Sequence, residues 1–263
     1  PKSWRPLVYC WRGGQRSGAF THILREIGWD AHRLDGGYKT WRRQVVDTLA
    51  TLPQQFSYKV ISGPTGSAKS RILEALGRQG AQILHLEDLA AHKGSVLGNL
   101  PDAPQPSQRM LETLLMAALA QLDPAQPVFV EAESRRIGAL QVPDALIFAI
   151  RAAPCLRIEA CRPARADFLL RDYDYFLSRP QWLIGQLGHL QGLQSNETLA
   201  RWTTLIESGD FRTLVDELLE KHYDPLYQRS QDKNYRYADA TVFAADDLGA
   251  DSIEAVARKI LES

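Results

Sequence analysis

The sequence predicts an α/β fold with a mainly parallel sheet, because short apolar runs of strand length alternate with longer segments of helical periodicity. Two glycine-containing loops, at residues 10–17 and 63–70, each follow a predicted strand and precede a predicted helix. Backbone N–H groups in such strand–loop–helix turns bind anions. The pattern therefore predicts two anion sites in one chain.

Composition limits the classes of protein to consider. The chain has 263 residues, of which 44% are hydrophobic and 24% charged, as in soluble globular proteins. Its 31 basic and 31 acidic residues give no net charge, so bulk charge does not indicate nucleic-acid binding, although a local basic patch would suffice for tRNA. We see no apolar run of membrane-spanning length and no signal peptide, and three cysteines fit a reducing, cytoplasmic setting without a membrane partner.

The first 50 residues read as part of a small α/β domain. We expect a strand at 7–9, a helix at 17–27, a strand at 29–34 and a helix at 38–50. Ser17 is predicted to cap the first helix, with Phe20, Ile23, Leu24 and Ile27 on one face. These elements amount to about half a domain, so we expect either that its first half is absent from the sequence or that another part of the protein completes the sheet.

After a polar connector at 51–57, residues 58–263 are expected to form a second α/β domain. The predicted strands are 58–62, 81–86, 127–132, 156–160 and 241–244, and the predicted helices are 70–79, 108–122, 163–177, 180–190, 197–207, 211–221 and 252–261. The Asp-Pro pair at 224–225 favours a turn.

The first loop carries Cys10 beside Arg12 and Arg16. Loop N–H groups, the helix N-terminus and the arginines would all depress the thiol pKa and favour the reactive thiolate. A buried structural cysteine is the alternative, but it would not require the two glycines and the arginines. Cys155 and Cys161 lie in an apolar stretch without partners at ligand spacing, so we interpret both as core residues.

The second loop nearly matches the phosphate-binding pattern G-x-x-x-x-G-K-[ST]. Its backbone would wrap a diphosphate, Lys69 would reach the diphosphate oxygens, and the Ser70 hydroxyl could hold a magnesium ion. Ala68 stands where glycine is usual, which predicts a slightly distorted or weakened loop. The residues expected to bind the diphosphate are Gly63, Thr65, Gly66, Ser67, Ala68, Lys69 and Ser70.

Polar residues elsewhere are candidates for the surroundings of this loop. Glu131 and Glu133 end a buried strand where such proteins place an acid that acts on metal or water, or else they form a plain acidic strand end. Arginines of the following helix have the position of a phosphate-binding lid, or else form a solvated basic face. The other candidates are His92, Lys93, Ser95, Ser134, Arg135, Arg162, Arg165 and Arg171.

Several stretches together resemble one family. Residues 9–17, and 34–37 followed by Trp41, resemble the active loop and closing motif of a rhodanese domain. The spacing of Cys10 and Arg16, which cysteine phosphatases share, gives a loop that suits a phosphate-sized or selenophosphate-sized anion. A rhodanese-like domain followed by a P-loop domain is characteristic of bacterial tRNA 2-selenouridine synthases. Residues 86–95, 133–138 and 222–227 also resemble that family, so the resemblance covers most of 7–227.

The resemblance implies the C-terminal part of a rhodanese-like domain at 1–50 and a P-loop NTPase-like domain with helical additions at 58–263. It implies an enzyme that converts 2-thiouridine at the wobble position of tRNA to 2-selenouridine. Geranyl diphosphate first alkylates the sulfur, and selenophosphate then supplies selenium. Residues 63–70 would bind the geranyl donor rather than a nucleotide, and Cys10, Arg12 and Arg16 would serve the selenium step. Tyr173, Tyr175, Trp182 and Trp202 belong either to the core or to an isoprenoid pocket.

Three other functions stay open. A P-loop kinase or ATPase would turn over nucleotide with the help of Lys69. A cysteine phosphatase would use the loop from Cys10 to Arg16, but Tyr9 stands where such enzymes have a histidine, and the second loop is left unexplained. A non-catalytic tRNA-binding module would show salt-dependent binding without chemistry.

Overall fold

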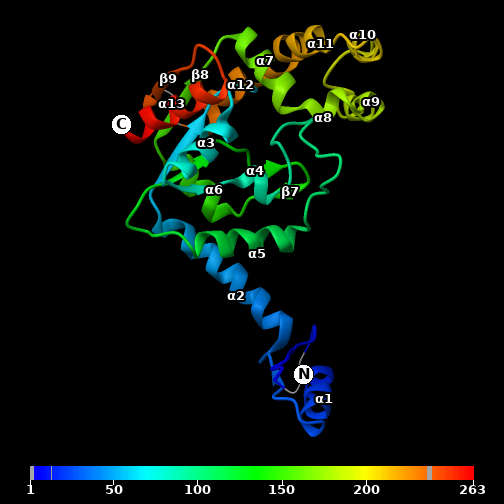
Figure 1. Ribbon diagram of the computed structural model, residues 1–263, viewed down its shortest axis with the longest axis vertical. Helices are drawn as coiled ribbons and strands as arrows, with labels where there is room; N and C mark the ends of the chain where they lie inside the picture. The colour runs from blue at the N-terminus through cyan, green and yellow to red at the C-terminus, as the bar shows by residue number, and fades with distance from the viewer. Residues whose placement is uncertain (1–2, 13, 236–238) are drawn as a thin grey trace. The chain divides into compact units, whose positions relative to one another are not determined.

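The computed structural model describes residues 3–12, 14–235 and 239–263. Contacts divide the chain into two compact units, Pro1–Thr51 and Leu52–Ser263, whose helices and strands are labelled in Figure 1. We call them the cysteine unit and the P-loop unit. The division falls within the expected connector, since Thr51 ends a helix of the first unit and Leu52–Gln55 form a 3-10 turn, η1, of the second.

The cysteine unit contains a two-stranded parallel sheet and two helices. Strand β1 (Leu7–Val8) pairs with β2 (His32–Arg33), and both are shorter than the sequence predicts. Helices α1 (Gln15–Glu26) and α2 (Gly37–Thr51) follow the two strands. Each strand is therefore followed by a turn and a helix, which places the loop with Cys10 at the carboxyl end of β1.

The sequence predictions for α1 were partly wrong. Gly14, at φ 81°, precedes the helix, and Ser17 lies inside its first turn, where it does not cap the helix end. The buried side chains are Ser17, Thr21 and Leu24, because small residues let the helix approach the loop that carries Cys10. Of the four residues expected on one face, Leu24 is buried, whereas Phe20, Ile23 and Ile27 are exposed.

The P-loop unit is built on a five-stranded sheet in which every neighbouring pair is parallel, in the order β4-β5-β3-β8-β9. This confirms the predicted α/β fold with a mainly parallel sheet. The strands are β3 (Tyr58–Ser62), β4 (Gln82–Leu84), β5 (Val128–Glu131), β8 (Cys155–Glu159) and β9 (Thr241–Ala244). Because β3 is central, the loop at its carboxyl end lies at the middle of the sheet edge, where ligands of such sheets bind.

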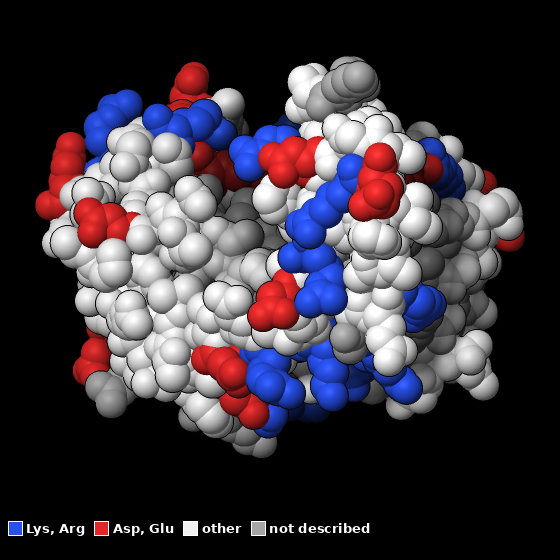
Figure 2. Space-filling model, turned by 90° about the horizontal axis from the view of Figure 1, so that it is seen from below, with Lys and Arg blue, Asp and Glu red and all other residues white. Residues whose placement is uncertain are grey.

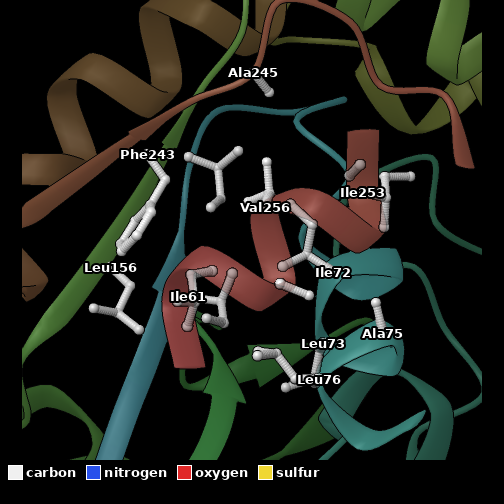
Figure 3. Close-up of a cluster of buried hydrophobic side chains, with 14 of the residues drawn as sticks. Ile61, Ile72, Leu73, Ala75, Leu76, Leu156, Phe243, Ala245, Ile253 and Val256 are labelled. Atoms are coloured by element: carbon white, nitrogen blue, oxygen red, sulfur yellow. The ribbon is translucent and has the colours of Figure 1, made fainter. Parts of the chain in front are cut away.

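One hydrophobic core joins the sheet to α3 (Lys69–Arg78) and α13 (Ala250–Leu261), and Phe168 of a later helix also belongs to it. Figure 3 shows Ile61, Leu156 and Phe243 of the strands beside Ile72 of α3 and Val256 of α13. Burial of these side chains away from water holds α3 against the sheet. The loop between β3 and α3 therefore has a fixed support on both sides.

A second core forms around the buried Trp202, among α8 (Asp174–Leu177), α9 (Pro180–Leu187), η2 (Gly188–Leu190), α10 (Asn196–Glu207) and α11 (Phe211–Leu218). The other elements of this region are α7 (Arg162–Asp172), η3 (Leu219–Tyr223) and α12 (Asp224–Asn234). The helix predicted at 163–177 is broken at Tyr173. The turn predicted at Asp224 is wrong: the chain stays helical from α11 into α12, because Pro225 lies in a first turn, where its missing N–H is not needed.

The structure contains elements that the sequence analysis did not predict. They are α4 (Leu86–Leu89), α6 (Asp144–Ala152) and the antiparallel pair β6 (Arg136–Ile137) and β7 (Leu140–Gln141). Helix α5 (Gln108–Leu119) was predicted. Cys155 is buried as expected, but Cys161 is exposed, because it precedes α7 rather than ending in the core.

On the face seen in Figure 2, Lys and Arg side chains are interspersed with Asp and Glu side chains. Among the described residues, no helix combines the length and the apolar character that a membrane span requires.

Candidate functional site

The loop at the carboxyl end of β3 lines a cavity of about 230 Å³, which we call the cradle cavity. The structure brings the whole predicted diphosphate-binding set together around it: Gly63, Thr65, Gly66, Ser67, Ala68, Lys69 and Ser70. Gly63 and Gly66 have φ angles of 154° and 82°. A side-chain carbon on Gly66 would lie 3.1 Å from the carbonyl oxygen of Arg165, so the loop packs closely under α7.

Ala68 adopts the left-handed conformation that glycine usually supplies, with φ 58° and ψ 27°. A residue with a Cβ atom pays about 1–2 kcal/mol for this conformation. The buried Ala68 nevertheless immediately precedes α3, as the phosphate-binding pattern requires. The substitution thus leaves the loop formed but strained at one residue.

Lys69 lies over the loop. Its Nζ atom donates hydrogen bonds to the carbonyl oxygens of Gly63, at 3.0 Å, and Pro64, at 3.4 Å. These neutral acceptors are weaker partners than a diphosphate oxygen, because hydrogen bonds between charged groups are roughly twice as strong. An anion in the cavity would therefore draw the ammonium group from the loop.

Two carboxylates face the loop across the cavity. The Ser70 hydroxyl donates a 2.7 Å hydrogen bond to Glu87. Glu87 and Glu133 both pack against Gly94, since a Cβ atom added to Gly94 would lie 2.7 Å from a carboxylate oxygen of each. Burial raises the pKa of both carboxyl groups, and the neighbouring negative charges raise it further. Sequence analysis missed Glu87, although it follows the strand next to β5.

These oxygen donors fit a magnesium ion. Magnesium is commonly held by one or two carboxylates together with substrate phosphates, and a hydroxyl and a carboxylate, Ser70 and Glu87, already lie in contact at the cradle. No group of three or more His, Cys, Asp or Glu side chains in the described parts of the chain is arranged to hold a metal by itself. A metal here would therefore depend on the ligand for part of its coordination.

Lys93 and Ser95 also line the cradle cavity. The Lys93 ammonium lies 3.3 Å from Asp172, whose carboxylate also accepts a 2.5 Å hydrogen bond from Arg71. It lies 5.7 Å from the centre of the Tyr173 ring as well. Lys69, at the start of α3, and Lys93 thus bring two cations to the cavity from two different parts of the chain.

Glu131 does not line the cavity. It is fully buried, accepts a 2.9 Å hydrogen bond from the Leu86 N–H and lies 2.7 Å from Nδ1 of His85. Burial opposes a charge on His85, but the hydrogen bond and the negative charge of Glu131 outweigh it and raise the pKa of His85 to about 9. Glu131 therefore ties β5 to the start of α4.

Other predicted residues either lie away from the cavity or have their polar atoms bound elsewhere. His92 is buried, and its ring packs against Gly98, where an added Cβ atom would lie 2.9 Å from the ring. Arg135 is exposed and pairs with Asp144 at 2.6 Å. Ser134 lines the cavity, but its hydroxyl is bonded to the backbone of Arg136.

The three arginines proposed for a lid have different partners. Arg162 is half exposed and pairs with Glu220 at 3.1 Å. Arg165 is buried and donates a 3.0 Å hydrogen bond to the carbonyl of Thr65 and two of 2.8 Å to Asp224. Arg171 instead donates to the carbonyl of Leu248. Arg165 thus fixes the backbone of the loop rather than facing the cavity.

An apolar cavity adjoins the cradle cavity, and we call it the apolar cavity. Most of its lining side chains come from α7, α8, α9 and α11, including Phe176, Leu183 and Leu214. Four residues line both cavities: Thr65, Ser95, Leu169 and Tyr173. Trp202 is a buried residue of the second core and does not line the apolar cavity. Tyr173 forms part of the cavity wall.

The cysteine unit has its own candidate site. The Ser17 hydroxyl donates a 3.3 Å hydrogen bond to the Cys10 sulfur. This bond, with further hydrogen bonds that involve the backbone of Ser17, Gly14 and Arg12, lowers the thiol pKa to about 7. The backbone N–H of Tyr38 donates a 3.1 Å hydrogen bond to the Cys10 carbonyl oxygen. Arg16 lines the shallow hollow beside Cys10, whereas the exposed Arg12 does not, and Gly13 lies outside the described residues. Ser17 is a site residue that sequence analysis read only as a cap.

Known proteins are similar to this chain over much of its length. The family model described as "tRNA 2-selenouridine synthase AAA domain" matches residues 56–201. The chain is 34% identical to the tRNA 2-selenouridine synthase of Alcanivorax borkumensis, covering 84% of this chain and 67% of the relative. It is 32% identical to that of Shewanella halifaxensis, covering 91% and 71%.

Coverage of the relatives is partial. The match to the tRNA 2-selenouridine synthase of Nitrosomonas europaea, at 34% identity, spans 64% of this chain and 44% of the relative. The match to a crystal structure of TT1252 from Thermus thermophilus covers 79% of this chain and 96% of that chain, at 16% identity and a TM-score of 0.35. The family model and the relatives together show that the chain belongs to the tRNA 2-selenouridine synthase family.

Proposed function

We propose that this chain takes part in the conversion of 2-thiouridine to 2-selenouridine at the wobble position of tRNA. The P-loop unit would transfer a geranyl group from geranyl diphosphate to the sulfur. The cysteine unit would serve the exchange of the geranylated sulfur for selenium from selenophosphate. The printed names of the relatives support selenouridine formation on tRNA, and the two sites support the division into two steps.

One observation carries the geranyl step: the cradle cavity and the apolar cavity meet at shared residues, among them Thr65 and Tyr173. An allylic diphosphate has a strongly anionic head joined directly to an apolar tail. A nucleoside triphosphate instead joins its phosphates to a polar ribose. The apolar cavity is the smaller, about 70 Å³ against 230 Å³, so the tail would enter by displacing lining side chains.

The cradle residues would stabilise the leaving group. Backbone N–H groups of the loop and the ammonium groups of Lys69 and Lys93 would hold the diphosphate, whose charge increases as its bond to carbon breaks. A magnesium ion, if bound by Ser70 and Glu87 together with the diphosphate, would neutralise part of that charge. Removal of the N3 proton makes the alkylated thiouridine neutral, so the overall reaction releases diphosphate and one proton.

The selenium step is proposed for Cys10, whose thiol pKa of about 7 leaves a large thiolate fraction at neutral pH. Arg16 lies at the same hollow and Arg12 two residues from the cysteine. Guanidinium groups bind phosphate-like anions in a bidentate manner, so both arginines are assigned to selenophosphate.

The direct test incubates the chain with 2-thiouridine tRNA and geranyl diphosphate without selenophosphate, followed by mass analysis of the nucleosides. We expect a geranyl-sized mass gain that Lys69→Ala abolishes and that Lys259→Ala, a change at an exposed lysine of α13, leaves intact. No mass gain, combined with nucleotide hydrolysis that requires Lys69, would favour the kinase or ATPase alternative instead.

The second step has a separate test. With selenophosphate added, Cys10→Ser should lose selenouridine formation while geranyl transfer continues, because the two steps use different sites. Full selenation by Cys10→Ser would remove Cys10 from the reaction.

A further inference from the structure

The reacting carbon of the prenyl donor can be located from the two cavities, if the proposed function holds. The diphosphate lies in the cradle cavity and the tail in the apolar cavity, so carbon C1, which joins them, must lie where the cavities meet. The residues at this junction are Thr65, Ser95, Leu169 and Tyr173. Only Tyr173 among them presents an aromatic face.

The face of Tyr173 already attracts a positive charge in the free protein. Lys93 Nζ lies 5.7 Å from the ring centre, within the range of cation–π attraction. Tyr173 is held in place by Phe176, whose ring is stacked on it at 5.5 Å with an interplanar angle of 3°. The half-buried ring is therefore fixed beside the cradle, in surroundings that screen a charge less than water does.

We propose that the ring of Tyr173 stabilises the positive charge that develops on C1 of the allylic group during transfer. The C1–O bond breaks with its electron pair on the diphosphate, and a sulfur lone pair of 2-thiouridine forms the new C1–S bond. The N3 proton of the base leaves on the diphosphate, so charge and atoms balance. Tyr173 forms no bond and provides only the electron-rich face of its ring.

Lys93 has to leave the ring before C1 can use it. Its present partners are the Asp172 carboxylate at 3.3 Å and the Tyr173 ring. A diphosphate in the adjoining cradle is a stronger partner than either, because it carries several negative charges. The diphosphate that brings C1 to the junction thus also draws Lys93 from the ring face.

The test changes the electron density of the ring without changing its size. Tyr173→Phe is compared with the same position carrying phenylalanine with one, two and three ring fluorines, because each fluorine weakens the cation–π attraction. We expect Tyr173→Phe to stay within about threefold of wild-type kcat for geranyl transfer. The value of kcat should then fall stepwise as fluorines are added to the ring. Tyr173→Leu, which has no ring, should lower kcat by about 30-fold relative to wild type, or about 2 kcal/mol. KM should change little in all of these variants.

Tyr175 supplies the matched control. It belongs to the same aromatic cluster, 5.8 Å from Tyr173, but lines neither cavity. The same fluorinated series at Tyr175 should leave kcat flat. A flat series at Tyr173 in a chain that transfers geranyl would overturn this inference and leave the proposed function standing. A wild-type chain that transfers no geranyl would overturn both.

Discussion

Arg165 and Asp224 are joined by two hydrogen bonds of 2.8 Å, one from each terminal nitrogen of the guanidinium group. One of those nitrogens also donates to the carbonyl of Thr65 in the phosphate-binding loop. Asp224 begins α12, whereas Arg165 lies on α7. A single buried side chain therefore connects the loop, the helix above it and a helix about 60 residues later in the chain.

Removing Arg165 should destabilise the P-loop unit. Arg165→Ala would leave Asp224 and the Thr65 carbonyl without their partner, so we expect a loss of about 2–3 kcal/mol in the free energy of unfolding. Arg162→Ala is the control on the same helix: its pair with Glu220 is half exposed and should contribute less than about 1 kcal/mol. Urea unfolding of both variants measures these changes. Equal losses in the free energy of unfolding would contradict the role of Arg165 in fixing the loop.

Ser17 should control the reactivity of Cys10. Because its hydrogen bond to the sulfur is the largest cause of the lowered thiol pKa, Ser17→Ala should move that pKa upward from about 7. The rate of alkylation by iodoacetamide as a function of pH measures it, with Ser3→Ala, an exposed position in the same unit, as the control. An unchanged profile in Ser17→Ala would show that the loop backbone alone sets the pKa.

Replacing Ala68 with glycine should stabilise the P-loop unit. Glycine adopts φ 58° without the steric cost of a Cβ atom, so Ala68→Gly should raise the free energy of unfolding by about 0.5–1 kcal/mol. Ala117→Gly, at an exposed position inside α5, should instead lower it by about 1 kcal/mol. A loss of stability in both variants would mean that strain at Ala68 is negligible.

His85 should make stability fall with rising pH. Its pKa is raised to about 9 in the folded protein from an ordinary value of 6.5, so its contribution is complete below pH 6.5 and is lost as pH rises to about 9. His85→Gln should therefore flatten the stability profile over that window. His189→Gln, at an exposed histidine, should retain the wild-type slope. Identical slopes in all three proteins would exclude the His85–Glu131 pair as the cause.

The sequence predicted the parts of the site that local pattern determines. The residues of the phosphate-binding loop follow from one motif, and the bounds of β3 and β9 follow from short apolar runs. All the predicted loop residues line the cradle cavity. Local chemistry is sufficient there because the loop, its strand and its helix are contiguous in the chain.

Partners that meet only through the tertiary fold could not be predicted in this way. Arg162 and Arg165 are three residues apart and chemically identical, yet one pairs with Glu220 near the surface and the other with Asp224 under the helix. Glu87 joins Ser70 across 17 residues of sequence. The contact of Ser17 with Cys10 was missed for the same reason, since it depends on how α1 packs against the loop and not on the local pattern of a helix cap.

The central claim is that the phosphate-binding loop holds an allylic diphosphate and the adjoining apolar cavity holds its tail. Calorimetric titration of the chain with geranyl diphosphate, inorganic diphosphate and ATP, each with magnesium, tests it most directly. We predict that geranyl diphosphate binds at least about tenfold more tightly than inorganic diphosphate, since burial of several methylene groups provides more than the 1.4 kcal/mol that this requires. ATP should bind more weakly than geranyl diphosphate. Equal affinity for geranyl diphosphate and inorganic diphosphate, or tightest binding of ATP, would contradict the account.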